Sequence, residues 1–186
     1  AYLATISADR VRHEMERTFA EDEPEQALGR MDSLGVLGAV HPKLSLDRQK
    51  EWALSRARTS SLSFAQLQAV CWCLLVWGMD VGQLPSLVSR LNLTRRVQDA
   101  ITDAVRLSGL EPRMDSPAVK PAEVFDMLHG RSLAALGTAA LQYTGPVARA
   151  NVSLYLHRLR HVKPLLTGND LGALGVSEGP ECGRIL

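Results

Sequence analysis

Hydrophobic positions along this chain recur every three to four residues, which is the period of a helix that buries one face. Near the N-terminus Val11, Met15 and Phe19 share such a face, while arginine and glutamate side chains occupy the others. Ser7 precedes them and has the side chain of a helix N-cap. The pattern predicts a charged surface helix that runs to about Ala20.

The same period predicts helices along the rest of the chain. Pro24 suits the first turn of a helix that runs to Gly35, and a short apolar helix then has to end before Pro42. Asp80 and Thr94 are suited to cap two further helices. The remaining helices are expected over residues 81–91, 95–108, 121–129, 132–142 and 146–162.

Residues 63–78 form the most apolar of the expected helices. Ser63 and Gln66 have the spacing of a capping box, and the side chains that follow are apolar on nearly every face. We therefore expect a central, buried helix here. The longest apolar run, residues 69–79, is far shorter than the ~20 residues that a helix needs to cross a bilayer, so no membrane segment is expected.

The chain ends in a dense group of helix signals. Thr167 and Asp170 have the spacing of a capping box, and Gly175 is suited to a left-handed C-cap. Gly179 and Pro180 then favour the start of a second helix. The pattern predicts a helix, a tight turn and a second helix. Backbone amides at such a turn can bind a phosphate, and an ordinary helical corner is the alternative.

No segment shows the alternating pattern of a strand with comparable strength. We expect an all-α protein of roughly nine to eleven helices and no sheet, since helices commonly have about a dozen residues. The polar, proline-rich residues 109–121 are the expected internal boundary. They favour a division into residues 1–45, 46–111 and 112–186.

Overall charge is close to balanced, with 21 Lys and Arg against 20 Asp and Glu, so the chain as a whole does not have the composition of a nucleic-acid binder. The distribution is more informative. Residues 128–168 contain no Asp or Glu, but they include Arg149, Arg158, Arg160 and Lys163. Such a basic stripe can follow a phosphate backbone without recognising bases. A solvated surface helix is the alternative explanation.

The sequence contains no complete catalytic or metal-binding pattern. His13 and Glu14 begin a zinc-protease pattern, but the position that should hold the second histidine is Arg17. His157 and His161 lie one turn apart without a carboxylate or thiol close in sequence that would complete a metal site. There is also no nucleophile-elbow or phosphate-loop motif. We predict no catalytic residue and no metal site in this chain.

Three cysteines form neither a disulfide framework nor a metal-binding pair, which favours a reducing, cytoplasmic setting. The chain also begins with Ala1 rather than methionine. We therefore expect it to be a piece of a longer polypeptide.

Two stretches resemble one known family. Residues 6–44 run ISADRVRHEMERTFAEDEPEQALGRMDSLGVLGAVHPKL, and residues 165–186 run LLTGNDLGALGVSEGPECGRIL. The first is similar to the neck-to-body segment of class II tRNA nucleotidyltransferases and bacterial poly(A) polymerases, and the second is similar to their tail. Arg10 and Glu14 match the family pattern I-S-x-E-R-I-x-x-E and would brace the neck, whereas Asp9 replaces its usual glutamate.

The resemblance implies a parent enzyme that adds nucleotides to RNA 3′ ends without a template, notably CCA to tRNA. Its catalytic carboxylates, Mg²⁺ and nucleoside triphosphates belong to an N-terminal head. Neither those carboxylates nor the E-D-x-x-R nucleotide-selecting motif is present here, so we expect this chain to hold no cofactor and to be inactive alone. Residues 1–45 would be the end of the neck and the start of the body, residues 46–111 the body and residues 112–186 the tail. Whether the parent adds C, A or both is left open.

The resemblance also implies a partner, which is tRNA or another structured RNA, held through its phosphates so that its 3′ end faces the missing head. The expected RNA contacts are the side chains of Arg149, Arg158, Arg160 and Lys163 and the backbone near Gly168 and Gly179. The alternative is a helical interaction module without RNA binding, in which the helix of residues 133–141 packs on a copy of itself in a homodimer. This alternative requires a contiguous exposed apolar patch.

Overall fold

The computed structural model describes residues 5–60, 62–162 and 168–175. Every regular element among these residues is helical, which confirms the prediction of an all-α, multi-helix protein. The buried apolar side chains, from Val11 near the start to Tyr155 near the end, form one continuous core.

The described chain opens with three helices, which are α1 (Ala8–Thr18), α2 (Pro24–Ser33) and α3 (Val36–Val40). α1 buries Val11 and Met15, as the hydrophobic period predicts. Gly35 has a φ of +71° and turns the chain between α2 and α3. Glycine suits this position because a Cβ disfavours the left-handed conformation.

α4 (Arg48–Arg58) is a helix that the hydrophobic period does not predict. Asp47 caps it by accepting a hydrogen bond from the backbone N–H of Lys50 at 2.8 Å. Its buried face consists of Leu54, two alanines and the side chain of Lys50. Because this face includes only one large apolar residue, the segment lacks the strong period of the neighbouring helices.

α5 (Phe64–Val76) is the central buried helix that the sequence predicts. The capping box forms: Ser63 N–H donates to Gln66 Oε1 at 2.8 Å, and Gln66 N–H donates to Ser63 Oγ at 3.4 Å. The C-terminal half of the helix is buried throughout. Trp72 packs edge to face with Phe19, with ring centroids 4.9 Å apart, and this contact joins α5 to the end of α1.

Three elements follow α5, namely the 3₁₀ turn η2 (Val81–Gln83) and the helices α6 (Leu84–Leu91) and α7 (Arg95–Ser108). The sequence predicts one helix over residues 81–91, but its first turn is 3₁₀ and the α-helix begins at Leu84. Pro85 lies in the first turn of α6, where its missing N–H leaves no internal bond unmade. α4 and α7 both pack against α5.

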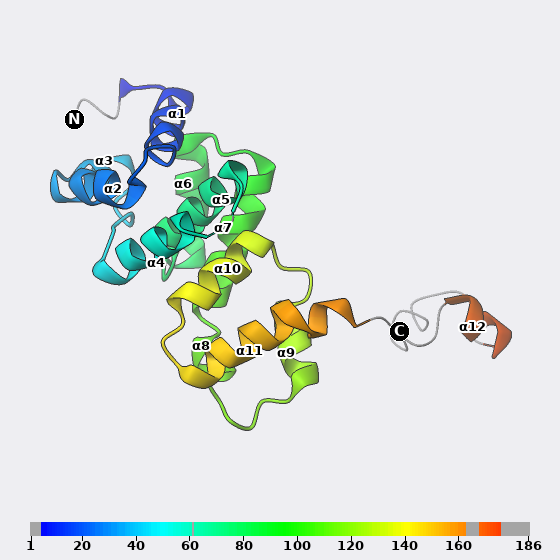
Figure 1. Ribbon diagram of the computed structural model, residues 1–186. Helices are drawn as coiled ribbons and strands as arrows, with labels where there is room; N and C mark the ends of the chain where they lie inside the picture. Colours follow the sequence, from blue (N-terminus) through cyan, green and yellow to red (C-terminus); the bar gives the residue numbers. More distant parts are fainter. Residues whose placement is uncertain (1–4, 61, 163–167, 176–186) are drawn as a thin grey trace.

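The remaining elements are α8 (Glu111–Met114), α9 (Pro121–Leu128), α10 (Leu133–Gln142), α11 (Pro146–His157), η3 (Leu159–His161) and α12 (Gly168–Ala173). α11 packs against α8 and α9, while α10 contacts α4, α5 and α7 on one side and α11 on the other. Figure 1 shows the resulting elongated arrangement, in which α10 lies between the group α1 to α7 and the group α8, α9 and α11.

Two acidic side chains of α8 and the turn after it hold the start of α11. Glu111 Oε1 accepts from the N–H of Gly145 at 3.0 Å, and Asp115 Oδ1 accepts from the N–H groups of Val147 and Ala148, each at 3.0 Å. These amides have no partner inside their own helix. A Cβ at Gly145 would lie 2.2 Å from the Asp115 carboxylate, so this close approach requires glycine.

Within the described ranges no single helix is long and apolar enough to cross a membrane. By length and composition alone, Phe64–Val76 and Val81–Leu91 reach that limit only as a pair, and the pair is bent by 112°.

Candidate RNA-binding surface

The outward face of α11 carries the first predicted contact residue. Arg149, Ser153 and His157 follow one another at four-residue intervals and are exposed. Val152 and Tyr155 lie on the other face and are buried in the core. His157 Nδ1 lies 2.9 Å from the backbone carbonyl of Ser153. Arg149 therefore projects from a helix whose orientation is set by core packing.

The next two predicted contacts lie beyond the end of this helix. The sequence predicts one helix over residues 146–162, but α11 ends at His157, and Arg158 leaves the helical region with a φ of −129° and a ψ of −62°. The 3₁₀ turn that follows lets Leu159 pack against the core. Arg158 and Arg160 consequently do not continue the stripe of Arg149. They extend from the turn at its end.

Arg149, Arg158 and Arg160 are exposed, and no carboxylate among the described residues lies within 4.0 Å of their side-chain nitrogens. Arg160 Nε donates instead to His161 Nε2 at 3.0 Å. Arg131, which belongs to the same acid-free stretch, differs because it pairs with Asp103 at 2.9 Å. Three guanidinium groups on α11 and the turn after it, without a carboxylate partner among the described residues, are therefore available to an anionic ligand.

Tyr155 lies on the buried face of α11, just before this turn. Burial raises the pKa of the Tyr155 phenol, and the nearby positive charge of Arg160 acts in the opposite direction. The side chain of Arg160 itself is exposed.

The terminal motif lies only partly within the described residues. Gly168 begins α12, Asp170 is exposed in its first turn, and Gly175 has a φ of +87°, which is the left-handed conformation expected of a C-cap. The other predicted residues of this region lie outside the described residues; they are Lys163, Thr167, Gly179 and Pro180.

The two motif residues of α1 are exposed. Arg10 and Glu14 lie at the edge of a small cavity of about 160 Å³ between α1, α2 and α3. Glu14 pairs with Arg17 at 3.8 Å.

Sequence reasoning missed the contacts that join α1 to the end of α6. Asp9 accepts from Asn92 Nδ2 at 3.0 Å and pairs with Arg12 at 3.1 Å, while Arg12 also donates to the backbone carbonyl of Asn92. Asn92 has a φ of +47° and ends α6. An asparagine directly after a predicted helix is a signal for such a cap, but its partner 83 residues away has no sequence signal.

Comparison with known proteins gives these features a family context. Residues 1–47 match the family described as "Probable RNA and SrmB- binding site of polymerase A". The whole chain is 26% identical to the A-adding tRNA nucleotidyltransferase of Geobacter sulfurreducens, over 201 aligned residues. The chain is therefore similar to part of a tRNA nucleotidyltransferase.

Solved structures share the fold of this chain. A CCA-adding enzyme with CTP has a TM-score of 0.76 at 19% identity, and its match covers 99% of this chain and 46% of that chain. The Thermotoga maritima CCA-adding enzyme complexed with tRNA has a TM-score of 0.74 at 18% identity, with the same two coverages. The chain spans less than half of these structures and 23% of the curated relative's length.

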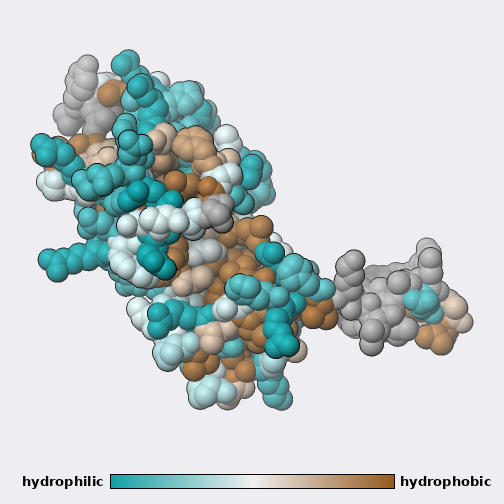
Figure 2. Space-filling view, viewed as in Figure 1, coloured by the Kyte–Doolittle hydropathy of each residue, from teal (hydrophilic) through white to brown (hydrophobic). Residues whose placement is uncertain are grey.

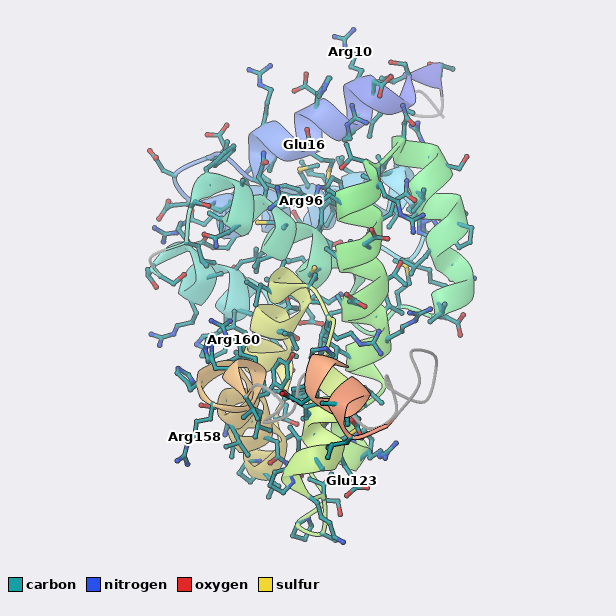
Figure 3. All side chains as sticks on the ribbon, turned by 90° about the vertical axis from the view of Figure 1, so that its right-hand side faces the viewer. Arg10, Glu16, Arg96, Glu123, Arg158 and Arg160 are labelled. Atoms are coloured by element: carbon teal, nitrogen blue, oxygen red, sulfur yellow. The ribbon has the colours of Figure 1, made fainter. Side chains whose placement is uncertain are left out.

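The predicted contacts Arg158 and Arg160 lie at the end away from α1. Figure 3 shows the labelled arginines Arg10, Arg96, Arg160 and Arg158 following one another from the top to the bottom of the view. The described ranges contain no group of three or more His, Cys, Asp or Glu side chains that could hold a metal ion.

Proposed function

We propose that this chain is the RNA-holding part of a template-independent RNA 3′-end nucleotidyltransferase, and that it positions tRNA for a catalytic head outside the chain. The observation that carries the proposal is the group of arginines on α11 and η3 without a carboxylate partner among the described residues, Arg149, Arg158 and Arg160, in a chain similar to a tRNA nucleotidyltransferase. Phosphate groups are the ligands that such exposed guanidinium groups bind best.

The mechanism we propose is positioning rather than chemistry. Arginines that contact phosphates fix the orientation of an RNA without recognising its bases. An A-form helix suits this mode, because its shape and backbone are more accessible than its base edges. An RNA fixed on α11 and η3 would keep its 3′ end at a constant distance from the N-terminal side of the chain. Holding two reacting groups in a fixed geometry lowers the entropy that the reaction has to lose.

Mg²⁺ and nucleoside triphosphates belong, in this proposal, to the head of the parent enzyme. The support is the resemblance of the chain to a family whose catalytic carboxylates precede the region matched here. No residue of this chain is assigned to either group.

The test is tRNA binding by the chain at several salt concentrations, measured by fluorescence anisotropy. A variant with Arg149→Ala, Arg158→Ala and Arg160→Ala should bind more weakly. A plot of the logarithm of its binding constant against the logarithm of salt concentration should have a shallower slope. The slope should decrease by about one for each phosphate that the variant no longer neutralises. The matched control is a variant with Arg30→Ala, Arg48→Ala and Arg106→Ala, which removes the same charge from three other exposed arginines.

The control should retain most of the affinity of the original chain. Circular dichroism and thermal melting check that both variants remain folded. Equally weakened binding in the two variants would mean that only the total charge matters, and would overturn the assignment of the surface. A chain that ignores tRNA at low salt would overturn the proposed function itself.

A further inference from the structure

The helix α10 is apolar on both of its faces. Ala135, Leu136 and Ala139 are buried against the helices around it. The opposite face begins with Leu133, which is 59% exposed, and continues through partly exposed alanine, glycine and leucine side chains. Figure 2 shows hydrophobic surface over the middle of the molecule, where α10 lies. A helix of this kind normally has a partner on each apolar face.

The outward face of α10 forms one wall of an apolar groove of about 670 Å³. Ala65 and Ala69 of α5 and Val97 of α7 line the other side. Leu62 stands at its edge and is 39% exposed. Exposed apolar surface of this extent, concave and bordered by helices, is typical of a site that receives another helix.

Gly137 lies in the middle of α10 and has no explanation within the described part of the chain. Glycine in a helix interior is less stable than alanine by roughly 0.5–1 kcal/mol. A Cβ built at Gly137 meets nothing within 4 Å, so no neighbouring atom among the described residues requires a glycine here. A missing side chain on the outward face of a helix allows another helix to approach closely.

The residues on the outward face read the same in both directions around Gly137. They are, in order, Leu133, Ala134, Gly137, Ala140 and Leu141. In an antiparallel pair of α10 helices that cross at Gly137, each Leu133 meets Leu141 of the second copy and each Ala134 meets Ala140. This reciprocity is the requirement of a two-fold interface, where residue i contacts residue j and residue j contacts residue i.

The charges around the groove also suit a second copy. Its edge carries Arg56 and Arg96 but also Glu16, so both signs are present. A surface with both charges can complement itself, whereas a uniformly basic edge would repel its copy and favour an RNA. α10 itself has no charged residue, so its burial leaves no charge without a partner.

We propose that the outward face of α10 is the contact of a two-fold homodimer, in which the α10 helices of two copies cross antiparallel at Gly137. This proposal goes beyond RNA binding and does not depend on it. The contact should extend from α10 to the edges of the groove, because a stable dimer buries about 800 Å² on each partner.

Sedimentation equilibrium of the chain over a range of protein concentrations tests the proposal. The chain should pass from monomer to dimer as its concentration rises. Gly137→Leu should raise the dissociation constant at least about tenfold, because the new side chain separates the crossing helices. The monomer should stay folded, since the space around the Cβ is open.

Gly38→Leu is the matched control, since Gly38 is an exposed helical glycine of α3 whose Cβ would also meet nothing within 4 Å. It should leave the dissociation constant unchanged. A chain that is monomeric at every concentration overturns the proposal. A dimer that both variants leave intact overturns it as well. If Gly137→Leu abolishes tRNA binding but not self-association, the groove receives RNA rather than a second copy.

Disulfide cross-linking tests the antiparallel direction. In a background with Cys182→Ser, Gly137→Cys should form a covalent dimer on mild oxidation, because the crossing brings the two copies of this position together. Leu133→Cys alone should not cross-link, but Leu133→Cys combined with Leu141→Cys should. Cross-linking through Leu133→Cys alone would indicate parallel helices and overturn the proposal.

The two remaining native cysteines do not interfere with this experiment. Cys71 and Cys73 are free and buried. Burial raises the pKa of the Cys71 thiol to about 12 and raises the pKa of Cys73 as well, so neither forms the reactive thiolate at neutral pH.

Discussion

At the scale of single residues, His41 shows how the fold selects one form of a side chain. It is buried between α3 and α6, and its Nδ1 accepts a hydrogen bond from the backbone N–H of Lys43 at 3.3 Å. Its Nε2 lies 2.9 Å from Ser86 Oγ, and that hydroxyl donates to the carbonyl of Gln83 at 2.8 Å. A neutral ring that carries its proton on Nε2 satisfies all of these contacts.

Burial, and secondarily the charge of Lys43, lowers the pKa of His41 below its usual value of 6.5. The unfolded chain therefore binds more protons than the folded chain when the pH lies between these two pKa values. We expect the free energy of unfolding to fall as the pH is lowered below 6.5 and through this window.

Urea unfolding at a series of pH values measures this effect. In His41→Gln, the pH dependence between about 7.5 and the acid limb should be smaller than in the original chain, by roughly the contribution of one titrating group. His13→Gln is the control, since His13 is exposed on α1. An unchanged profile in His41→Gln would contradict the prediction.

At the scale of elements, the capping of α11 joins the proposed RNA surface to the rest of the fold. The carboxylates of Glu111 and Asp115 accept hydrogen bonds from the backbone N–H groups at the start of this helix. Anionic side chains of the same chain therefore already bind its N-terminus. The orientation of α11, and with it the position of Arg149, depends on these bonds.

Asp115→Ala removes the acceptor of two of these N–H groups. We expect it to lower the free energy of unfolding by about 0.5–2 kcal/mol, which is the range for loss of a helix N-cap. Asp126→Ala, which removes a carboxylate from α9 that caps no helix start, should change it little. Thermal or urea unfolding measures both variants. Equal stability of the two would mean that Asp115 does not hold α11.

At the scale of the whole molecule, the chain covers 46% of two CCA-adding enzymes of the same fold. We expect the chain with Mg²⁺, CTP and ATP to add no nucleotide to a tRNA that lacks its 3′ CCA, because it does not contain the catalytic carboxylates that the family resemblance implies. Incorporation of labelled nucleotides measures this, with a complete CCA-adding enzyme as the positive control. Incorporation by the chain alone would contradict the expectation.

Several expectations at this scale stay predictions. One of them is the division of the chain into three regions, residues 1–45, 46–111 and 112–186. Another is the cytoplasmic location of the protein. The contact residues in the terminal motif, including Lys163 and Gly179, are a third.

Most of the helices follow from the sequence because their causes are local. The capping box of Ser63 and Gln66 involves residues three positions apart, and the period of Val11 and Met15 extends over one turn. Interactions of this range are visible along the chain. The motifs of residues 6–44 and 165–186 are also local patterns, and they were sufficient to indicate a resemblance to the family.

Where the sequence failed, the cause was a contact between distant residues. α4 was missed because Lys50 supplies part of its buried face. Its Nζ donates to the carbonyl of Leu75 at 3.3 Å, which lies 25 residues away. The helix predicted over residues 146–162 ends at His157 in the structure, because Leu159 packs against the core in a 3₁₀ turn.

The sequence by itself determined the helical class, most helix starts, the resemblance to a family and the basic character of the region around α11. Only the tertiary structure decided that Arg131 has a carboxylate partner, how Asp9 joins Asn92, and that the outer face of α10 lines an open groove. The physical reason is one of range. Helix periods and caps act within about four residues, whereas burial and ion pairing depend on which segments the fold brings together.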